Sequence, residues 1–291
     1  MGNKGLKKWV AAVLLWFWTL AAWAEYKLNL QTPQTQLGKD IYDLHTIITV
    51  ICFIIFIGVF GFMFYAVFKH RKSVGHKAAQ FHENTAVEVA WTLIPAVILI
   101  AMAVPATSTL IAMRDTTEPD LTIKATGYQW KWGYDYLKGE GEGISFYSVL
   151  STPPAQIDGR DVAGRNANPH YLLETDNHVV VPVGKKVRIL TTAADVIHAW
   201  AMPSFWVQMD AVPGRINETW FKVDRPGVYY GQCFQLCGTK HGFMPIAVEV
   251  VSKERFAEWI TAKQKENGIA PVTGAAAPTT PVAALAAAPA A

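Results

Sequence analysis

The sequence predicts a membrane-anchored all-β protein, in which a hairpin of two membrane helices precedes a Greek-key β-sandwich or barrel. Two stretches, residues 46–68 and 91–113, are almost wholly apolar and long enough to cross a bilayer. After residue 121 the chain changes to short strand-like segments separated by Gly, Pro, Asn and Asp, without long helical periodicity. The 291-residue chain is therefore expected to hold one extramembrane domain, over residues 115–266, beside its membrane segments.

The N-terminus has the pattern of a bacterial secretory signal. Three lysines precede an apolar run over residues 9–20, and Ala22-Trp23-Ala24 follows as a small-residue cleavage site. We expect residues 1–24 to be removed and residues 25–45 to form a periplasmic segment. The alternative is a first membrane helix that is not cleaved, although the apolar run is short for a span.

The loop between the two apolar stretches sets the orientation. Residues 69–77 carry four fixed positive charges, which by the positive-inside rule place the loop over residues 69–90 in the cytoplasm. The β domain then lies on the periplasmic side of a bacterial inner membrane. Pro95 and Pro105 interrupt the second stretch, and membrane helices tolerate proline where neighbouring groups satisfy the freed carbonyls, which indicates packing against a partner.

Charge is divided between the anchor and the domain. Residues 115–260 carry 17 acidic and 14 basic side chains, whereas the rest of the chain carries 6 acidic and 12 basic ones. A mildly acidic domain favours a basic protein partner and repels nucleic acid. Candidate contacts for such a partner, which are otherwise solvated surface groups, are Asp135, Asp158, Asp176, Asp195 and Asp210.

Residues 231–245 contain a dense set of soft metal ligands. Two thiols, an imidazole and a thioether follow one another at spacings of four, four and three residues: Cys233, Cys237, His241 and Met244. These groups suit copper rather than magnesium or calcium, and zinc rarely takes a thioether. Gly238 and Pro245 argue against a helix, so the ligands are expected on a loop between strands at residues 227–232 and 246–251.

A second imidazole is available upstream. His198 follows the strand-like residues 186–192 and is expected at a strand end, where it can supply a fourth strong ligand. The alternative is a disulfide between Cys233 and Cys237, which an exported domain permits and which would leave the other ligands without a role. Asp195, three residues before His198, can orient that ligand through hydrogen bonds.

The pattern His198…Cys233-x3-Cys237-x3-His241-x2-Met244 resembles the copper-A site of the cytochrome c oxidase subunit 2 family, and the resemblance extends over about residues 30–260. It implies a cupredoxin-like domain with a dinuclear copper-A centre, in which both thiolates bridge the two ions. It also implies that the two histidines are terminal ligands, that the methionine is a weak thioether ligand, and that the backbone carbonyl of Gln235 completes the set.

Gln235 departs from the family pattern, which usually has Glu at this position. The backbone carbonyl is unaffected, but the side chain loses its negative charge. In the family that carboxylate reaches a magnesium or manganese ion at the boundary with subunit 1. The uncharged Gln235 side chain is therefore not expected to bind a magnesium or manganese ion as the family's glutamate does, although its amide still offers a carbonyl oxygen.

Aromatic residues alternate over residues 128–136. Tyr128, Trp130, Trp132, Tyr134 and Tyr136 recur with period two, which predicts five rings on one face of a single strand, with most of them packed in the core. The resemblance to the family implies that Trp130 is the residue through which electrons enter from cytochrome c.

Glu88 stands at the cytoplasmic start of the second apolar stretch. An acid there complements a helix dipole, as Glu83 also does, but an ionisable residue beside hydrocarbon is a candidate for a proton path as well. Residues 87–92 resemble the family's entrance to the K proton channel of subunit 1, which makes Glu88 the candidate residue for that entrance.

The C-terminal region divides into a helix and a tail. Residues 252–266 predict an amphipathic helix capped by Ser252, and residues 267–291 are rich in Ala and Pro and are expected to be disordered. The tail has no Cys-x-x-Cys-His run for a covalent haem. Electrons are therefore expected from a separate donor.

The resemblance implies a subunit of a proton-translocating oxidoreductase. The chain would accept electrons from cytochrome c outside the membrane and pass them to haem and copper in subunit 1, where the oxygen chemistry takes place, with subunit 3 as a further partner. The alternatives are subunit 2 of a quinol oxidase, a branch that lacks the copper ligands, and a membrane-anchored copper-binding or delivery protein. Nitrous-oxide reductase carries a similar copper loop, but this chain has no room for that enzyme's large catalytic domain.

Overall fold

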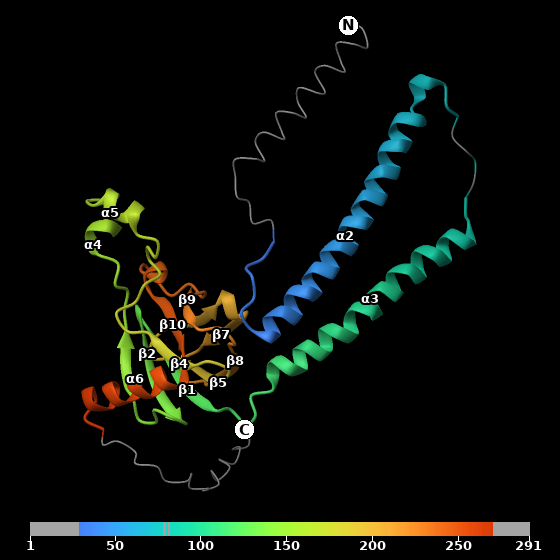
Figure 1. Cartoon of the computed structure of the whole chain (residues 1–291). Helices are drawn as coiled ribbons and strands as arrows, with labels where there is room; N and C mark the ends of the chain where they lie inside the picture. Colours follow the sequence, from blue (N-terminus) through green and yellow to red (C-terminus); the bar gives the residue numbers. More distant parts are fainter. Residues whose placement is uncertain (1–28, 78–79, 81, 270–291) are drawn as a thin grey trace, which may run out of the picture.

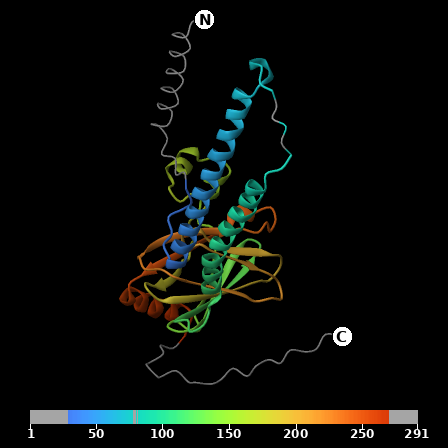
Figure 2. The ribbon, with the colours of Figure 1, turned by 90° about the vertical axis from the view of Figure 1, so that its right-hand side faces the viewer.

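A helical hairpin and a β-sandwich make up the described part of the chain (Figure 1). The structure, a computed structural model, describes residues 29–77, 80 and 82–269. The expected signal sequence, residues 1–24, and nearly all of the expected tail, residues 267–291, lie outside these residues. In Figure 2 the near ends of the two helices overlap the sandwich, and the far end of the hairpin extends beyond it.

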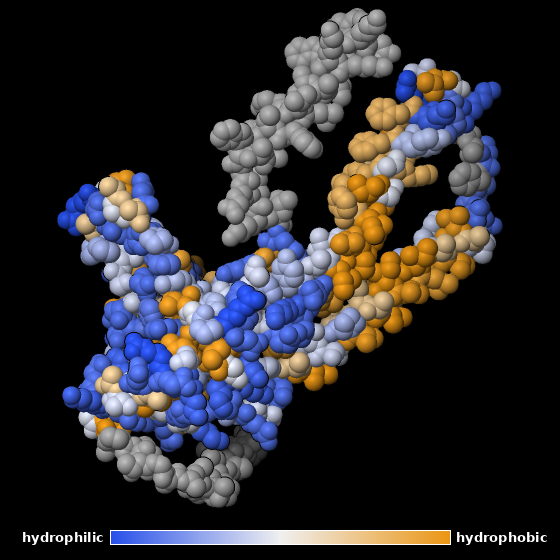
Figure 3. Space-filling view, viewed as in Figure 1, coloured by the Kyte–Doolittle hydropathy of each residue, from blue (hydrophilic) through white to orange (hydrophobic). Residues whose placement is uncertain are grey.

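The hairpin consists of helices α2 (Gln36–Lys69) and α3 (Thr85–Arg114), with the short 3-10 helix η1 (Lys72–Val74) between them. Both long helices are apolar and long enough to cross a membrane, and their exposed surface is mostly apolar (Figure 3). Each helix extends beyond its predicted apolar stretch because polar residues cap it. Thr35 accepts a hydrogen bond from the first turn of α2, and Asn84 accepts one from the first turn of α3.

The start of α2 is fastened to the domain. The Thr35 hydroxyl accepts from the Gly38 N–H at 3.0 Å and donates to the Phe205 carbonyl at 2.9 Å. A Cβ at Gly38 would lie 2.9 Å from Cδ1 of Trp206, so the contact requires glycine. The cap that begins the membrane helix therefore also fixes where the helix meets the sandwich.

Ten strands within the described residues form two five-stranded sheets. In spatial order, the first sheet contains β3 (Ser145–Ser148), β2 (Lys131–Lys138), β1 (Leu121–Tyr128), β5 (Lys186–Ala193) and β8 (Asn217–Lys222). The second contains β4 (Val179–Pro182), β10 (Pro245–Val251), β9 (Gly227–Cys233), β6 (His198–Met202) and β7 (Val207–Ala211). The chain crosses between the sheets several times, for example from β5 to β6 and from β8 to β9. The predicted β-sandwich behind a two-helix hairpin is confirmed.

Short helices complete the domain. α4 (Pro154–Ile157) and α5 (Val162–Ala167) lie in the connection between β3 and β4. η2 (Pro203–Phe205) and η3 (His241–Phe243) lie beside the strands of the second sheet. α6 (Lys253–Glu266) is the predicted terminal helix, and Ser252 caps it by accepting from the Arg255 N–H at 3.3 Å.

Buried aromatic residues join the two sheets. Trp200 on β6 donates its indole N–H to the Tyr134 hydroxyl on β2 at 3.2 Å. The Tyr136 hydroxyl donates to the Val180 carbonyl at 2.8 Å and accepts from the Val180 N–H at 3.0 Å. The buried polar groups of these three aromatic side chains thus have partners, and the bonds fix one sheet against the other. Loops at the ends of the strands consequently start from a rigid frame.

The aromatic run does not lie on one strand, and that prediction is wrong. β1 ends at Tyr128, residues Gln129 and Trp130 form the turn, and β2 begins at Lys131. A two-residue turn keeps the period-two spacing, so the alternation of rings continues through it. The three rings on β2, those of Trp132, Tyr134 and Tyr136, are buried as predicted.

Candidate metal centre

The two thiols of the predicted loop lie close together inside the domain. Cys233 is the last residue of β9, and Cys237 lies in the loop that follows, with both side chains buried. Their Sγ atoms are 3.9 Å apart, whereas a disulfide bond is about 2.05 Å long. Both cysteines are free thiols, so the disulfide alternative is not what this structure contains.

His198 reaches the thiols from the neighbouring strand. It is the first residue of β6, and Trp200 on the same strand pairs with Cys233 on β9. The His198 ring is fully buried, with Nδ1 3.9 Å from the Sγ atom of Cys233. The ligand atoms of His198, Cys233 and Cys237 all lie within 4.8 Å of one another, close enough for the three side chains to hold one metal ion.

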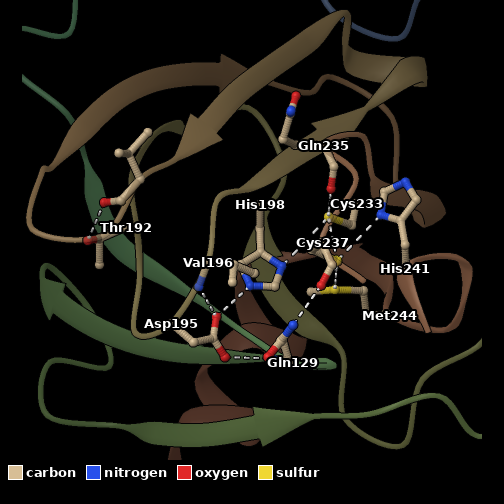
Figure 4. A network of polar contacts seen from close by, with 11 residues as sticks. Gln129, Thr192, Asp195, Val196, His198, Cys233, Gln235, Cys237, His241 and Met244 are labelled. Carbon is tan, nitrogen blue, oxygen red and sulfur yellow. Dashed lines mark hydrogen bonds and ion pairs between the residues drawn. The ribbon is translucent and has the colours of Figure 1, made fainter. Parts of the chain in front are cut away.

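His241 and Met244 approach from the far side of the sulfur pair. Nδ1 of His241 and Sδ of Met244 are each 3.5 Å from the Sγ atom of Cys237. Figure 4 shows His198 and His241 on opposite sides of the two cysteines. The structure therefore brings all five predicted side chains together, with one imidazole at each end of the cluster.

Gln235 contributes through its backbone. Its carbonyl oxygen is 3.3 Å from the Cys233 Sγ atom, while its side chain is exposed and points away from the sulfurs (Figure 4). The two candidate roles of Gln235, copper ligation by the backbone carbonyl and magnesium or manganese ligation by the side chain, therefore involve opposite directions (Figure 4). The carbonyl belongs to the cluster, and the amide faces outward.

The two thiols differ in electrostatic environment. Burial opposes ionisation of Cys233, but hydrogen-bonding groups led by His198 outweigh burial and lower the pKa of Cys233. Burial and the neighbouring Cys233 raise the pKa of Cys237 to about 12. Burial also disfavours the charged form of His198, but contacts with Cys233 and Asp195 outweigh it and raise the pKa of His198. A metal ion that binds here must therefore displace the Cys237 proton.

A hydrogen-bond network behind the cluster orients His198. Oδ1 of Asp195 is 2.8 Å from Nε2 of His198, which leaves Nδ1 facing the sulfurs. The other Asp195 oxygen accepts from the Gln129 N–H at 2.7 Å, and the Gln129 side chain donates to the Cys237 carbonyl at 2.8 Å. The network connects the start of β6 to the loop after β9, because it runs from His198 to Cys237. The orienting role expected of Asp195 has a direct geometric basis.

Aromatic residues flank the cluster, and two of these contacts have no signal in the sequence. The indole N–H of Trp132 donates to the Met244 carbonyl at 3.3 Å, and the Trp132 and His198 rings are 6.0 Å apart. Trp130, in the turn, lies against Gly238 of the metal loop, where an added Cβ would be 3.0 Å from the indole. The indole nitrogen of Trp130 is buried and has no hydrogen-bond partner among the described residues.

Glu88 lies apart from this centre. It is in the first turn of α3, at the end of the hairpin away from the sandwich (Figure 1). One of its carboxylate oxygens is 3.4 Å from the Asn84 N–H, which is a capping contact. The structure therefore gives Glu88 a local role at the helix terminus and does not bring it to the metal cluster.

The donor set fits copper. Two thiols, two imidazoles and a thioether are soft or borderline ligands, whereas zinc rarely takes a thioether. Met244 is 1% exposed and touches Cys237, so the thioether is part of the cluster rather than a surface group. The residues that would hold the metal are His198, Cys233, Cys237, His241, Met244 and the carbonyl of Gln235.

Known proteins share both parts of the chain. The family model described as cytochrome C oxidase subunit II, periplasmic domain, matches residues 121–251, and the model of the transmembrane domain of the same subunit matches residues 23–108. A probable cytochrome c oxidase subunit 2 of Rickettsia bellii is 40% identical over 242 residues, which cover 82% of this chain and 85% of that protein.

A further relative and one solved structure are also similar to this chain. The cytochrome c oxidase subunit 2 of Cereibacter sphaeroides is 38% identical over 241 residues, which cover 80% of this chain and 78% of that protein. The solved periplasmic domain of subunit II of the cytochrome oxidase of Bradyrhizobium japonicum is 45% identical, covers 51% of this chain and 96% of its own, and has a TM-score of 0.44.

Gly127 should be required for the position of His198. A Cβ at Gly127 would lie 2.7 Å from Cδ2 and 2.8 Å from Cγ of the buried ring, so a Gly127→Ala change must move the imidazole. We expect copper affinity to fall by about 10- to 100-fold, measured by competition with a chelator. Gly242→Ala is the matched control, because nothing lies within 4 Å of a Cβ there. Equal affinity in the two variants would contradict this role.

Proposed function

This chain belongs to the cytochrome c oxidase subunit II family, and from that membership we propose that it carries single electrons through a two-copper centre into an oxidase complex. Membership of the family and the cluster of His198, Cys233 and Cys237 indicate copper binding. The chain is a membrane-anchored subunit of an oxidoreductase complex and has partner subunits there. The number of coppers, the roles of single residues and the electron donor are the proposal.

The observation that carries the proposal is the sulfur pair between two imidazoles. Because Cys233 Sγ and Cys237 Sγ are 3.9 Å apart, both can lie between two ions, with His198 at one end and His241 at the other. A copper pair bound in this way supplies a one-electron carrier. The thioether of Met244 and the carbonyl of Gln235 add two weak donors beside the sulfurs.

The surrounding residues favour electron transfer over reaction with a substrate. The cysteines, His198 and Met244 are all buried, which keeps water away from the sulfurs. Asp195, Gln129 and the strands fix the ligand positions, so little rearrangement is needed when the charge changes. The oxygen chemistry of the complex is therefore assigned to another subunit, and this chain has the role of a relay.

Trp130 is the proposed residue through which electrons enter. Its ring lies against Gly238 in the metal loop, and the neighbouring Gln129 is hydrogen-bonded to the Cys237 carbonyl. The Trp130 indole thus contacts the loop that carries the metal ligands and is also partly exposed to solvent. A cytochrome c, which the net acidic charge of the domain would attract, is the proposed donor.

Apolar side chains around the metal loop support docking to a partner subunit. Leu236 is 76% exposed and Phe234 50% exposed, and both flank Gln235. Two large apolar groups on an outward-facing loop favour a protein interface. We assign this surface to subunit 1, with subunit 3 as a further partner. The uncharged Gln235 amide beside them argues against a magnesium or manganese ion bound as in the family.

Electron paramagnetic resonance of the copper-loaded full chain tests the function. We expect two copper ions per chain and a spectrum of one electron shared over both. Cys237→Ser removes a bridging sulfur and should abolish that spectrum, whereas Cys52→Ser, in the membrane helix, should leave it unchanged. A mononuclear copper signal would favour a copper-delivery protein, and metal-free protein with oxidised Cys233 and Cys237 would refute both copper functions.

Trp130→Phe tests the route of electron entrance. With copper content unchanged, electron transfer from reduced cytochrome c in stopped flow should slow by at least about tenfold. Trp259→Phe is the control, because that ring belongs to α6 and packs against Tyr136. An unchanged rate of electron transfer into the Trp130→Phe protein would show that electrons do not enter through Trp130.

Glu88→Gln tests the proposed proton-path role. The variant retains the shape of the side chain but cannot ionise, so proton uptake and oxygen reduction by the assembled complex should slow at normal copper content. Glu83→Gln, just before α3 in the preceding loop, should behave as wild type. Normal proton uptake in Glu88→Gln would exclude the proton-path role, and the capping contact with Asn84 would be the remaining role of Glu88.

A further inference from the structure

A cavity lies where the hairpin meets the sandwich, away from the metal centre. Its volume is about 600 Å³, which is within the range of ligand-binding sites. The ends of α2 and α3 form one wall, and η2, β7 and β8 form the other. The apolar lining that matters here consists of Leu37, Leu110, Met113, Val207, Met209 and Phe221.

The cavity is placed at the level of lipid headgroups. Between Glu88 and its last residue, Arg114, α3 carries no charged side chain; Arg114 lines the cavity, and the polar domain begins directly beyond it. Two further lining residues, Trp206 and Trp220, are of the type that concentrates at membrane interfaces. The Trp220 indole donates to the Ala112 carbonyl of α3 at 3.1 Å, so this ring joins the domain to the membrane helix.

Two cationic side chains in the lining are available to an anion. Neither Arg114 nor Lys222 forms an ion pair or a side-chain hydrogen bond within residues 29–77, 80 and 82–269. Of the two acids in the lining, Glu218 is paired with Arg188, which leaves Asp224. Lys222 is also near Asp120, but that carboxylate is already held by Lys185 at 3.0 Å.

We propose that this cavity binds one membrane glycerophospholipid. Its phosphate lies between Arg114 and Lys222, and its acyl chains lie along the apolar wall formed by Leu110, Met113 and Met209. An amine-bearing headgroup, such as phosphatidylethanolamine, also satisfies Asp224. A free phosphate ion would use the two cations but would leave the apolar wall without an occupant.

The bound lipid completes the junction between the anchor and the domain. On the α2 side, Thr35 and Gly38 fasten the hairpin directly to η2 and Trp206. On the α3 side, the Trp220 bond to Ala112 leaves the cavity beside it. A lipid held there fills the gap with both apolar and charged contacts, and so steadies the domain over the membrane.

Photocrosslinking tests the proposal in the assembled complex, with no need to assume a role for the copper. The full chain with its partner subunits is placed in vesicles of phosphatidylethanolamine and phosphatidylglycerol that contain a phosphatidylethanolamine with a diazirine in its acyl chain. Peptide mass spectrometry should find the label on the segments that contain Met113 and Met209. Arg114→Gln/Lys222→Gln should lower this label by about tenfold.

Two further double variants, a charge control outside the cavity and one that fills the cavity, distinguish a lipid in the cavity from lipids elsewhere around the helices. Lys39→Gln/Arg225→Gln removes the same charge from the same end of the molecule but outside the cavity, and should leave the label unchanged. Leu110→Trp/Met209→Trp fills the cavity without changing charge and should lower the label as the first variant does. An unchanged circular dichroism spectrum verifies that each variant is folded.

Three results would overturn the proposal. Equal labelling of wild type and all variants would indicate the ordinary lipid layer around the helices. Loss of the label in Arg114→Gln/Lys222→Gln, with wild-type labelling in Leu110→Trp/Met209→Trp, would indicate a charged contact outside the apolar cavity. Absence of label on both segments in the wild type would indicate that another part of the complex covers the cavity.

Discussion

The approach of two buried thiols between two imidazoles is the interaction on which the account depends. Cys233 and Cys237 lie 3.9 Å apart, and His198 and His241 contact one sulfur each. Such a cluster gathers four titratable groups in a poorly solvated interior, where their charged forms are unfavourable without a cation. The raised pKa of Cys237, caused by burial and by Cys233, expresses that cost. A soft metal ion neutralises the thiolates and so removes this electrostatic cost. The geometry that is unfavourable without metal therefore favours binding of a soft metal ion.

The sandwich and its anchor serve to keep this geometry constant. β6 and β9 are neighbouring strands that carry His198 and Cys233, and Tyr136 and Trp200 hold their sheet against the other. Gln129 links Asp195, the partner of His198, to the Cys237 loop. At the opposite boundary, Thr35 fixes the start of α2 to the domain, so the position of the metal centre over the membrane is set by hydrogen bonds as well as by the lipid layer.

The sequence was sufficient for features that depend on neighbouring residues. The apolar stretches, the strands on either side of the metal loop and the terminal helix with its Ser252 cap all follow from local pattern and spacing. It failed where distant residues meet. The Gln129 bonds join positions 66 and 108 residues apart, and the close contact of Gly127 with His198 depends on how β1 packs against β6. The prediction of a single strand over residues 128–136 was wrong because a two-residue turn preserves the period-two alternation of the rings. The spacing of the aromatic residues alone therefore does not reveal the hairpin.

X-ray absorption at the copper edge, on the copper-loaded full chain, tests the central claim most directly, because it reports the atoms bound to the metal itself. A sulfur pair shared by two ions predicts that every copper has sulfur and nitrogen neighbours and that a second copper lies within bonding range. Copper surrounded by nitrogen and oxygen alone, with no metal neighbour and with Cys233 and Cys237 joined as a disulfide, would contradict the account.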